Sequence, residues 1–144
     1  MSHFADSSAL VKLYADEAGF EAVRDLSALV VSQLARVEVP AAIWRKHRTS
    51  ELTSGQAATL AAEFEADWFG DDEAAPRFAI VAVVAGVLDD AARLAAAHGL
   101  RAYDAVQLAS ALRVAAADPN FGGFAAYDRA LRTAAAAEGL TLVV

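Results

Sequence analysis

The sequence contains no cysteine, which excludes a disulfide framework, a zinc site built from thiolates and a cysteine nucleophile. Its three histidines, His3, His47 and His98, are too scattered to show the spacing of metal ligands. Long apolar runs are also missing, since the longest has eleven residues and a membrane-spanning helix needs about 20. The amino terminus MSHFAD has no basic region followed by an apolar stretch, so no secretory signal is visible. We therefore expect a soluble cytoplasmic protein with no attachment to a membrane.

Positive charge is scarce as well. Twelve lysines and arginines face 19 aspartates and glutamates, which gives a formal net charge of −7. This balance disfavours a protein that binds nucleic acid through a basic surface alone. Apolar residues make up 57% of the 144 residues, enough to build the core of one domain. Because no linker or low-complexity tail interrupts the chain, we expect a single domain over residues 1–144.

Four acidic residues stand out because each lies in an otherwise apolar stretch. Asp6, Glu38, Asp104 and Asp128 occur in the segments FADSSALVKLY, LARVEVPAAIW, LRAYDAVQLASAL and FAAYDRALRTAA. Unpaired carboxylates in a protein interior are costly, and several in one place raise each other's pKa values. A divalent cation neutralises several of them at one point, and ligands made only of oxygen suit Mg²⁺ or Mn²⁺.

Short apolar segments alternate with segments of helical periodicity along the chain. Strands are expected at residues 3–5, 29–31, 78–83 and 124–127, with the final TLVV as an edge strand. The segment 78–83 has no polar alternation and therefore reads as a strand buried on both faces. Strands that alternate with helices predict an α/β protein with a mostly parallel sheet between layers of helices.

The helix signals place the acids near one edge of this sheet. Asp6 is expected to cap a helix that runs to about Ala15, and Asp128 to begin the last helix. Ser32 is expected to cap the helix that contains Glu38. The other helices are expected at about 20–26, after the Thr53 and Gln56 capping box, before Gly99, and at 102–116. Ligands of such folds bind beyond the carboxyl ends of the strands, where Asp6 and Asp128 fall.

Two structural explanations of the acids compete with a metal site. Asp6 and Asp128 can act as ordinary helix caps, because aspartate is favoured at that position. The acids can also form ion pairs with Lys12, Arg36 and Arg101. With a bound Mg²⁺, in contrast, the cluster would suit hydrolysis of a phosphodiester, since the metal polarises a phosphate oxygen and lowers the pKa of its water.

Taken together, four segments resemble the motifs of the PIN-domain ribonucleases, and within them those of the VapC toxins of prokaryotic toxin–antitoxin pairs. The segments are DSSALVKLY, SQLARVEV, LRAYDAVQLASAL and AAYDRALRTAA. They occur in the family's order and cover nearly the whole chain. The resemblance implies a three-layer α/β/α PIN-like domain with the activity of a metal-dependent endoribonuclease. It also implies an RNA substrate, a homodimer and a cognate VapB-like antitoxin that holds the enzyme inactive.

By the same resemblance, Asp6, Glu38, Asp104 and Asp128 form the catalytic cluster that holds Mg²⁺ or Mn²⁺, with Asp6 and Asp104 as the most direct ligands. Ser8 stands where the family often has a small hydroxyl residue that orients the first acid, although it also fits a first-turn serine bonded to backbone.

Two further positions bear on this cluster. Arg101 is expected to contact a substrate phosphate or to pair with an acid. One departure from the family is Ala126, where a serine or threonine is common two residues before the last acid. A hydrogen bond to Asp128 is therefore expected to be missing.

Other functions remain open from the sequence. A haloacid-dehalogenase-like phosphatase would use Asp6 as its nucleophile, but that fold usually has a second acid where this chain has Ser8. A degenerate PIN module that serves only as a scaffold is disfavoured by the presence of all four acids. The basic cluster at residues 45–48 fits either RNA phosphate contacts or favourable charges at the end of a helix.

Overall fold

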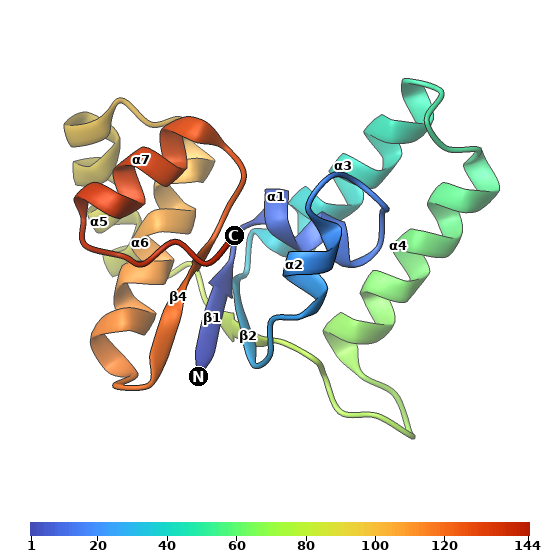
Figure 1. Ribbon diagram of the computed structural model, residues 1–144, viewed down its shortest axis with the longest axis horizontal. Helices are drawn as coiled ribbons and strands as arrows, with labels where there is room; N and C mark the ends of the chain where they lie inside the picture. The colour runs from blue at the N-terminus through green and yellow to red at the C-terminus, as the bar shows by residue number, and fades with distance from the viewer.

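The computed structural model describes residues 1–144 and contains one parallel sheet with helices on both faces (Figure 1). The strands are hydrogen-bonded in the order β3-β2-β1-β4, and every adjacent pair runs parallel. Their bounds are Ser2–Ala5 for β1, Leu29–Ser32 for β2, Ala79–Val81 for β3 and Phe121–Ala125 for β4. This topology confirms the three-layer α/β class with a parallel central sheet.

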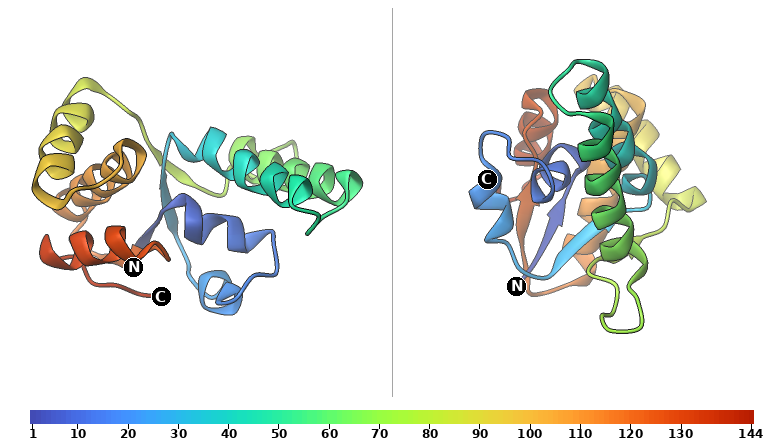
Figure 2. Two further views of the ribbon diagram at one scale, coloured as in Figure 1. Left: turned by 90° about the horizontal axis from the view of Figure 1, so that it is seen from above. Right: turned by 90° about the vertical axis from the view of Figure 1, so that its right-hand side faces the viewer.

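Helices connect the parallel strands and form two groups. One side of the sheet carries α5 (Ala85–His98), α6 (Ala102–Ala117) and α7 (Arg129–Ala137). The other side carries α1 (Ser7–Leu10), the 3-10 helix η1 (Val11–Leu13), α2 (Phe20–Arg24), α3 (Ala35–Arg48) and α4 (Ser54–Phe69). Figure 2 shows α3 and α4 as a helical hairpin that extends away from the sheet.

The hydrophobic core is divided by the sheet into two clusters. Successive residues of a strand point to opposite faces, so Phe4 packs with α5, α6 and α7 while Ala5 packs with α1, α3 and α4. Phe4 also stacks on Phe124 of the neighbouring strand β4, with ring centroids 5.8 Å apart. Strands with apolar side chains on both faces are typical of parallel sheets covered by helices.

Several local signals act as the sequence predicts. Thr53 and Gln56 form the complete capping box of α4. Gly99 adopts a left-handed φ of 64° and ends α5, as a helix-terminating glycine does. None of the helices is both long enough and apolar enough to cross a lipid bilayer.

Two predicted helix boundaries are wrong in the layer of helices that contains α1 and α3. The helix expected from Asp6 to about Ala15 is α1 followed by the tighter turns of η1, which end at Leu13. Ser32 is the last residue of β2 and does not cap α3, which begins at Ala35. The Ser32 hydroxyl instead accepts a hydrogen bond of 3.2 Å from the Leu34 backbone N–H, within the connecting turn.

Three predicted strands also differ. The segment 78–83 contains β3 only at Ala79–Val81, and this strand lies at the sheet edge with Ile80 42% exposed. The strand predicted at residues 124–127 is β4, which begins earlier, at Phe121, and ends at Ala125. The carboxyl terminus forms only an isolated bridge between Leu142 and Phe124. An apolar run alone does not distinguish a central strand from an edge strand, because pairing depends on the whole topology.

Candidate active site

All four acids predicted from the sequence line one cavity of about 950 Å³. Asp6 directly follows β1, and Asp128 follows β4 after two intervening residues. Glu38 and Asp104 lie in the first turns of α3 and α6. Every one of these carboxylates therefore sits at the start of a helix, where the partial positive charge of the backbone N–H groups favours a negative side chain.

Asp6 is the most deeply buried acid of the cavity, with 3% of its surface exposed. One of its oxygens, Oδ1, accepts hydrogen bonds from the Ser8 hydroxyl at 2.7 Å and from the Ala9 backbone N–H at 2.9 Å. Burial raises the pKa of Asp6 to about 7, and the nearby charges of Asp104 and Glu38 add to the rise against these hydrogen bonds. No lysine or arginine forms an ion pair with Asp6.

Ser8 connects Asp6 to the end of β4. Its hydroxyl donates to Asp6 and accepts a 2.9 Å hydrogen bond from the backbone N–H of Tyr127. Ser8 therefore bonds both to the acid and to backbone, as its two expected roles require. Ala126 is fully buried and has no polar side chain to offer Asp128.

Glu38 is held by two polar side chains that the sequence analysis did not identify. Its Oε1 accepts hydrogen bonds from the Ser7 hydroxyl at 3.0 Å and from the Gln107 amide at 2.8 Å. The amide of Gln107 also donates to the Ser7 hydroxyl at 3.1 Å. The sequence does contain a signal for Gln107, because it is a polar residue in the same apolar segment as Asp104, one helical turn further along.

Arg101 joins the remaining two acids. Its guanidinium lies 3.0 Å from Asp104 Oδ2 and 3.6 Å from Asp128 Oδ1. The Arg101 side chain is 81% exposed, so it lies at the mouth of the cavity and this pairing is screened by solvent. Asp128 also caps α7 through a 2.9 Å hydrogen bond from the Leu131 backbone N–H to Oδ2.

The alternative of a purely structural ion-pair network accounts for only part of the cluster. Arg101 pairs with two acids, but Lys12 bonds to the Ala18 carbonyl and Arg36 pairs with Glu65. Neither of these last two cations forms an ion pair with a carboxylate of the cluster. Helix capping likewise explains Asp6 and Asp128 but not the other two acids.

The carboxylate oxygens of the four acids are suitable ligands for a hard divalent cation. Hydrogen bonds use one oxygen of each of three acids, and no hydrogen bond or ion pair uses Asp6 Oδ2, Glu38 Oε2 or Asp104 Oδ1. Carboxylate oxygens are the ligands that Mg²⁺ and Mn²⁺ prefer. As the side chains lie, no three of the acids are grouped closely enough to hold one ion. The set of metal ligands therefore stays a prediction.

A basic rim lies on the side of the cavity formed by α3. Arg45 and Arg48 line the cavity, are exposed, and form no ion pair with any carboxylate. Lys46, between them in sequence, is instead bonded to Glu17 at 2.9 Å and lies 3.8 Å from Glu51. In an acidic protein, these two unpaired arginines give this side of the cavity a local positive charge.

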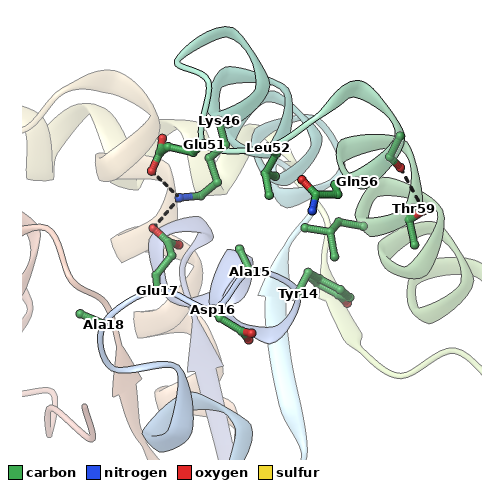
Figure 3. A pocket seen from close by; sticks show the side chains of 12 residues that line it. Tyr14, Ala15, Asp16, Glu17, Ala18, Lys46, Glu51, Leu52, Gln56 and Thr59 are labelled. Atoms are coloured by element: carbon green, nitrogen blue, oxygen red, sulfur yellow. Dashed lines mark hydrogen bonds and ion pairs between the residues drawn. The ribbon is translucent and has the colours of Figure 1, made fainter.

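A second cavity of about 970 Å³ adjoins the first, between the loop after η1 and the turn that joins α3 to α4 (Figure 3). Glu17, Lys46 and Glu51 line both cavities. Figure 3 shows Lys46 reaching between the two glutamates, so this ion-pair triad separates the cavities. None of the four predicted acids lines the second cavity.

Comparison with known proteins identifies the family. The PIN domain model matches residues 4–137, which span all four acids. The chain is 39% identical over 140 residues to Ribonuclease VapC45 of Mycobacterium tuberculosis strain CDC 1551, covering 94% of this chain and 90% of that protein. The same identity and coverage are found with Ribonuclease VapC49 of Mycobacterium tuberculosis strain H37Rv. With its parallel α/β/α fold and this match over almost its whole length, the chain belongs to the PIN-domain family.

Proposed function

We propose that this protein is a VapC-type toxin, an endoribonuclease that hydrolyses RNA phosphodiester bonds with a divalent cation. One observation carries the proposal: four acids from four separate segments line a single cavity, and the most buried of them has no cationic partner. Similarity to two proteins named as VapC ribonucleases supports the same activity. The proposed substrate is cellular RNA, so we expect the protein to act in the cytoplasm.

The residues of the cavity divide into two chemical groups. Asp6, Glu38, Asp104 and Asp128 would hold Mg²⁺ or Mn²⁺ through their oxygens. When bound, such an ion supplies Lewis-acid activation of the phosphate and lowers the pKa of a water molecule. Ser8 keeps Asp6 oriented by its hydrogen bond.

The arginines make up the second group. Arg45 and Arg48 are placed to bind phosphates of the RNA strand, because their charges are unpaired and they line the same cavity as the acids. Arg101 stands at the mouth of the same cavity, where it balances two of the acids and can also meet a phosphate.

The phosphatase alternative has less support at this site. Phosphatases of the haloacid dehalogenase type usually have a second acid two residues after the nucleophile, and Ser8 occupies that position. The hydroxyl of Ser8 is engaged between Asp6 and the Tyr127 backbone. No histidine lines the cavity, so no serine–histidine pair is available for nucleophilic catalysis either.

We also propose two protein partners, a second copy of this chain and a VapB-like antitoxin. Large apolar side chains at residues 80, 84 and 88 are 42%, 51% and 50% exposed along β3 and the start of α5. Val37 on α3 is 60% exposed as well. Apolar side chains exposed in groups are typical of surfaces that bind protein. Light scattering of the purified chain tests for the homodimer.

The activity is tested with purified protein, a single-stranded RNA and Mg²⁺. We expect endonucleolytic fragments that disappear with EDTA and return when Mg²⁺ or Mn²⁺ is added in excess. The Asp6→Asn variant should lose the activity while remaining folded, since the amide keeps the acceptor for Ser8 and Ala9. Cleavage that persists in EDTA or in this variant would refute the proposal, because a contaminating ribonuclease or another site would then be responsible.

A further inference from the structure

Gln107 is the most buried polar side chain that lines the acidic cavity, with 1% of its surface exposed. It lies on α6 among apolar residues such as Val106 and Leu108, which are 6% and 0% exposed. Its amide nitrogen donates to two groups on other elements, the Ser7 hydroxyl of α1 and Glu38 Oε1 of α3. This triad of Ser7, Glu38 and Gln107 therefore joins three helices at the floor of the cavity.

The orientation of the Gln107 amide follows from the chemistry of its neighbours. A carboxylate oxygen only accepts hydrogen bonds when ionised, so the group that faces Glu38 Oε1 at 2.8 Å must be the NH₂ of the amide. The reversed amide would place two acceptor oxygens against each other. With the NH₂ in this position, Gln107 Oε1 is buried and has no hydrogen-bond partner.

An unsatisfied buried acceptor lowers the stability of the folded protein. An apolar side chain of similar size would avoid this loss at a position surrounded by apolar residues. Gln107 is thus a poor choice for stability, and its bonds to Ser7 and Glu38 need another explanation. Residues that conflict with the packing of their surroundings are typical of functional sites.

The two carboxylate oxygens of Glu38 differ in their hydrogen bonds. Ser7 and Gln107 both donate to Oε1, while Oε2 has no partner. Glu38 Oε2 is not among the buried unpartnered atoms, so it is accessible from the cavity. The carboxylate is consequently anchored through one oxygen and presents the other to whatever the cavity binds.

We propose that Gln107, with Ser7, is a positioning residue that holds Glu38 so that Oε2 faces the cavity, where it can bind the proposed cation. The proposal rests on the proposed function and adds to it the residue that orients one of the four acids. Hydrogen bonds to the non-coordinating atoms of a ligand commonly set metal affinity and activity, and their loss typically weakens either by about 10–100-fold.

The decisive variant is Gln107→Leu, which removes the amide but fills a similar volume. We expect kcat for RNA cleavage to fall at least about tenfold with little change in KM, and the affinity for Mn²⁺, measured by calorimetry without RNA, to fall similarly. The melting temperature of the metal-free variant should equal or exceed that of the wild type, because the unsatisfied oxygen is gone.

Ser7→Ala gives an independent second variant, because it removes the other donor to the same oxygen. It should weaken Mn²⁺ binding in the same direction, and the double variant should lose less than the sum of the two single losses in free energy. Ser110→Ala is the matched control: Ser110 is a fully buried polar residue of the same helix, and its hydroxyl bonds only to the Val106 carbonyl. This control should keep wild-type kcat and Mn²⁺ affinity.

Wild-type kcat and Mn²⁺ affinity in Gln107→Leu would overturn the proposal. A fall in both accompanied by a lower melting temperature, and reproduced by Ser110→Ala, would overturn it too, since general damage to α6 would then explain the loss. If the wild-type protein cleaves no RNA, the proposed function fails. The Mn²⁺ affinities and melting temperatures would still decide whether Gln107 positions Glu38.

Discussion

The Ser8 hydroxyl donates a 2.7 Å hydrogen bond to Asp6 Oδ1, two residues before it in the chain. The same hydroxyl accepts from the backbone N–H of Tyr127, 119 residues away in sequence. One serine therefore ties the buried acid at the end of β1 to the segment that follows β4. This link fixes Asp6 relative to the segment that leads from β4 to Asp128.

The stability of the metal-free protein should fall as the pH rises from about 4 to 7. Burial raises the pKa of Asp6 from 3.8 to about 7. In this range the unfolded chain has released a proton that the folded protein keeps, so the free energy of unfolding falls with pH, by on the order of 4 kcal/mol in total from this group. The Asp6→Asn variant cannot ionise at this position and should escape the loss.

Urea denaturation in EDTA between pH 4 and pH 8 checks this. The variant should be the more stable protein at pH 8, and the difference should shrink towards pH 4. Saturating Mn²⁺ should reverse the order at pH 8 if Asp6 binds the ion. A difference between the two proteins that is constant with pH would contradict the raised pKa.

Removing the hydroxyl of Ser8 should raise the pKa of Asp6 further. The hydrogen bond from Ser8 stabilises the ionised carboxylate and is the largest influence that lowers this pKa. In Ser8→Ala, the carboxyl carbon of Asp6 should titrate above the wild-type midpoint near 7 in a carbon-13 NMR experiment on metal-free protein. An unchanged midpoint would mean that water replaces the hydroxyl. Thr59→Ala serves as a control, since its hydroxyl bonds only to the Gly55 carbonyl.

Neutralising Arg45 and Arg48 should weaken RNA binding and make it less sensitive to salt. Both arginines line the cavity and are unpaired, so each can neutralise one phosphate of the RNA and release part of its counterion charge. For the double variant to glutamine, with Asp6→Asn to prevent cleavage, we expect the slope of log K against log salt to fall by about 1.4, at about 0.7 per contact with a single strand. Fluorescence anisotropy from low to high salt measures this slope.

A matched control for the arginines is Arg93, which lies on α5, outside the cavity, and pairs with Asp90. The slope of log K against log salt should be the same for Arg93→Gln as for the protein without this change. If Arg93→Gln lowers the slope by about 0.7, half of the fall expected for the double variant, net charge and not the basic rim governs binding.

Replacing Arg101 should strengthen the binding of divalent cations. The guanidinium balances Asp104 and Asp128, and a bound cation must compete with it for the same carboxylates. Because Arg101 is 81% exposed, the effect is small, up to about fivefold in Mn²⁺ affinity, as for other exposed ion pairs. Arg101→Gln should show the gain by calorimetry and Arg101→Lys, which keeps the charge, should show less. Weaker binding in Arg101→Gln would mean that the arginine helps to order the site.

Loss of the α4 cap should affect stability without affecting the site. Thr53→Ala removes the hydroxyl that accepts from the Gln56 backbone N–H at 3.1 Å. The expected cost is about 1 kcal/mol in the free energy of unfolding. RNA cleavage at a temperature well below the transition should be unchanged, because Thr53 does not line the acidic cavity. A large loss of activity would show that the α3–α4 hairpin influences the site.

The sequence by itself determined which residue types the site has and the order of the elements that carry them. Helical periodicity, the capping box at Thr53 and the stop at Gly99 act within a few residues, so they can be read without a structure. Acids in apolar segments can be recognised in the same way. Local patterns also place Asp6 and Asp128 at helix starts, whereas they wrongly predict that Ser32 caps the helix that carries Glu38. Alternating strands and helices then lead to a parallel sheet, since its connections need helical crossovers.

The tertiary structure decided which of these side chains meet and what their surroundings do to them. Gln107 reaches Glu38 across 69 residues and Ser7 across 100, and no local pattern specifies such pairs. The raised pKa of Asp6 depends on burial under several elements at once. The edge position of β3 depends on which strands pair. These properties arise from packing between distant segments, which fixes desolvation and hydrogen-bond partners only when the whole chain is folded.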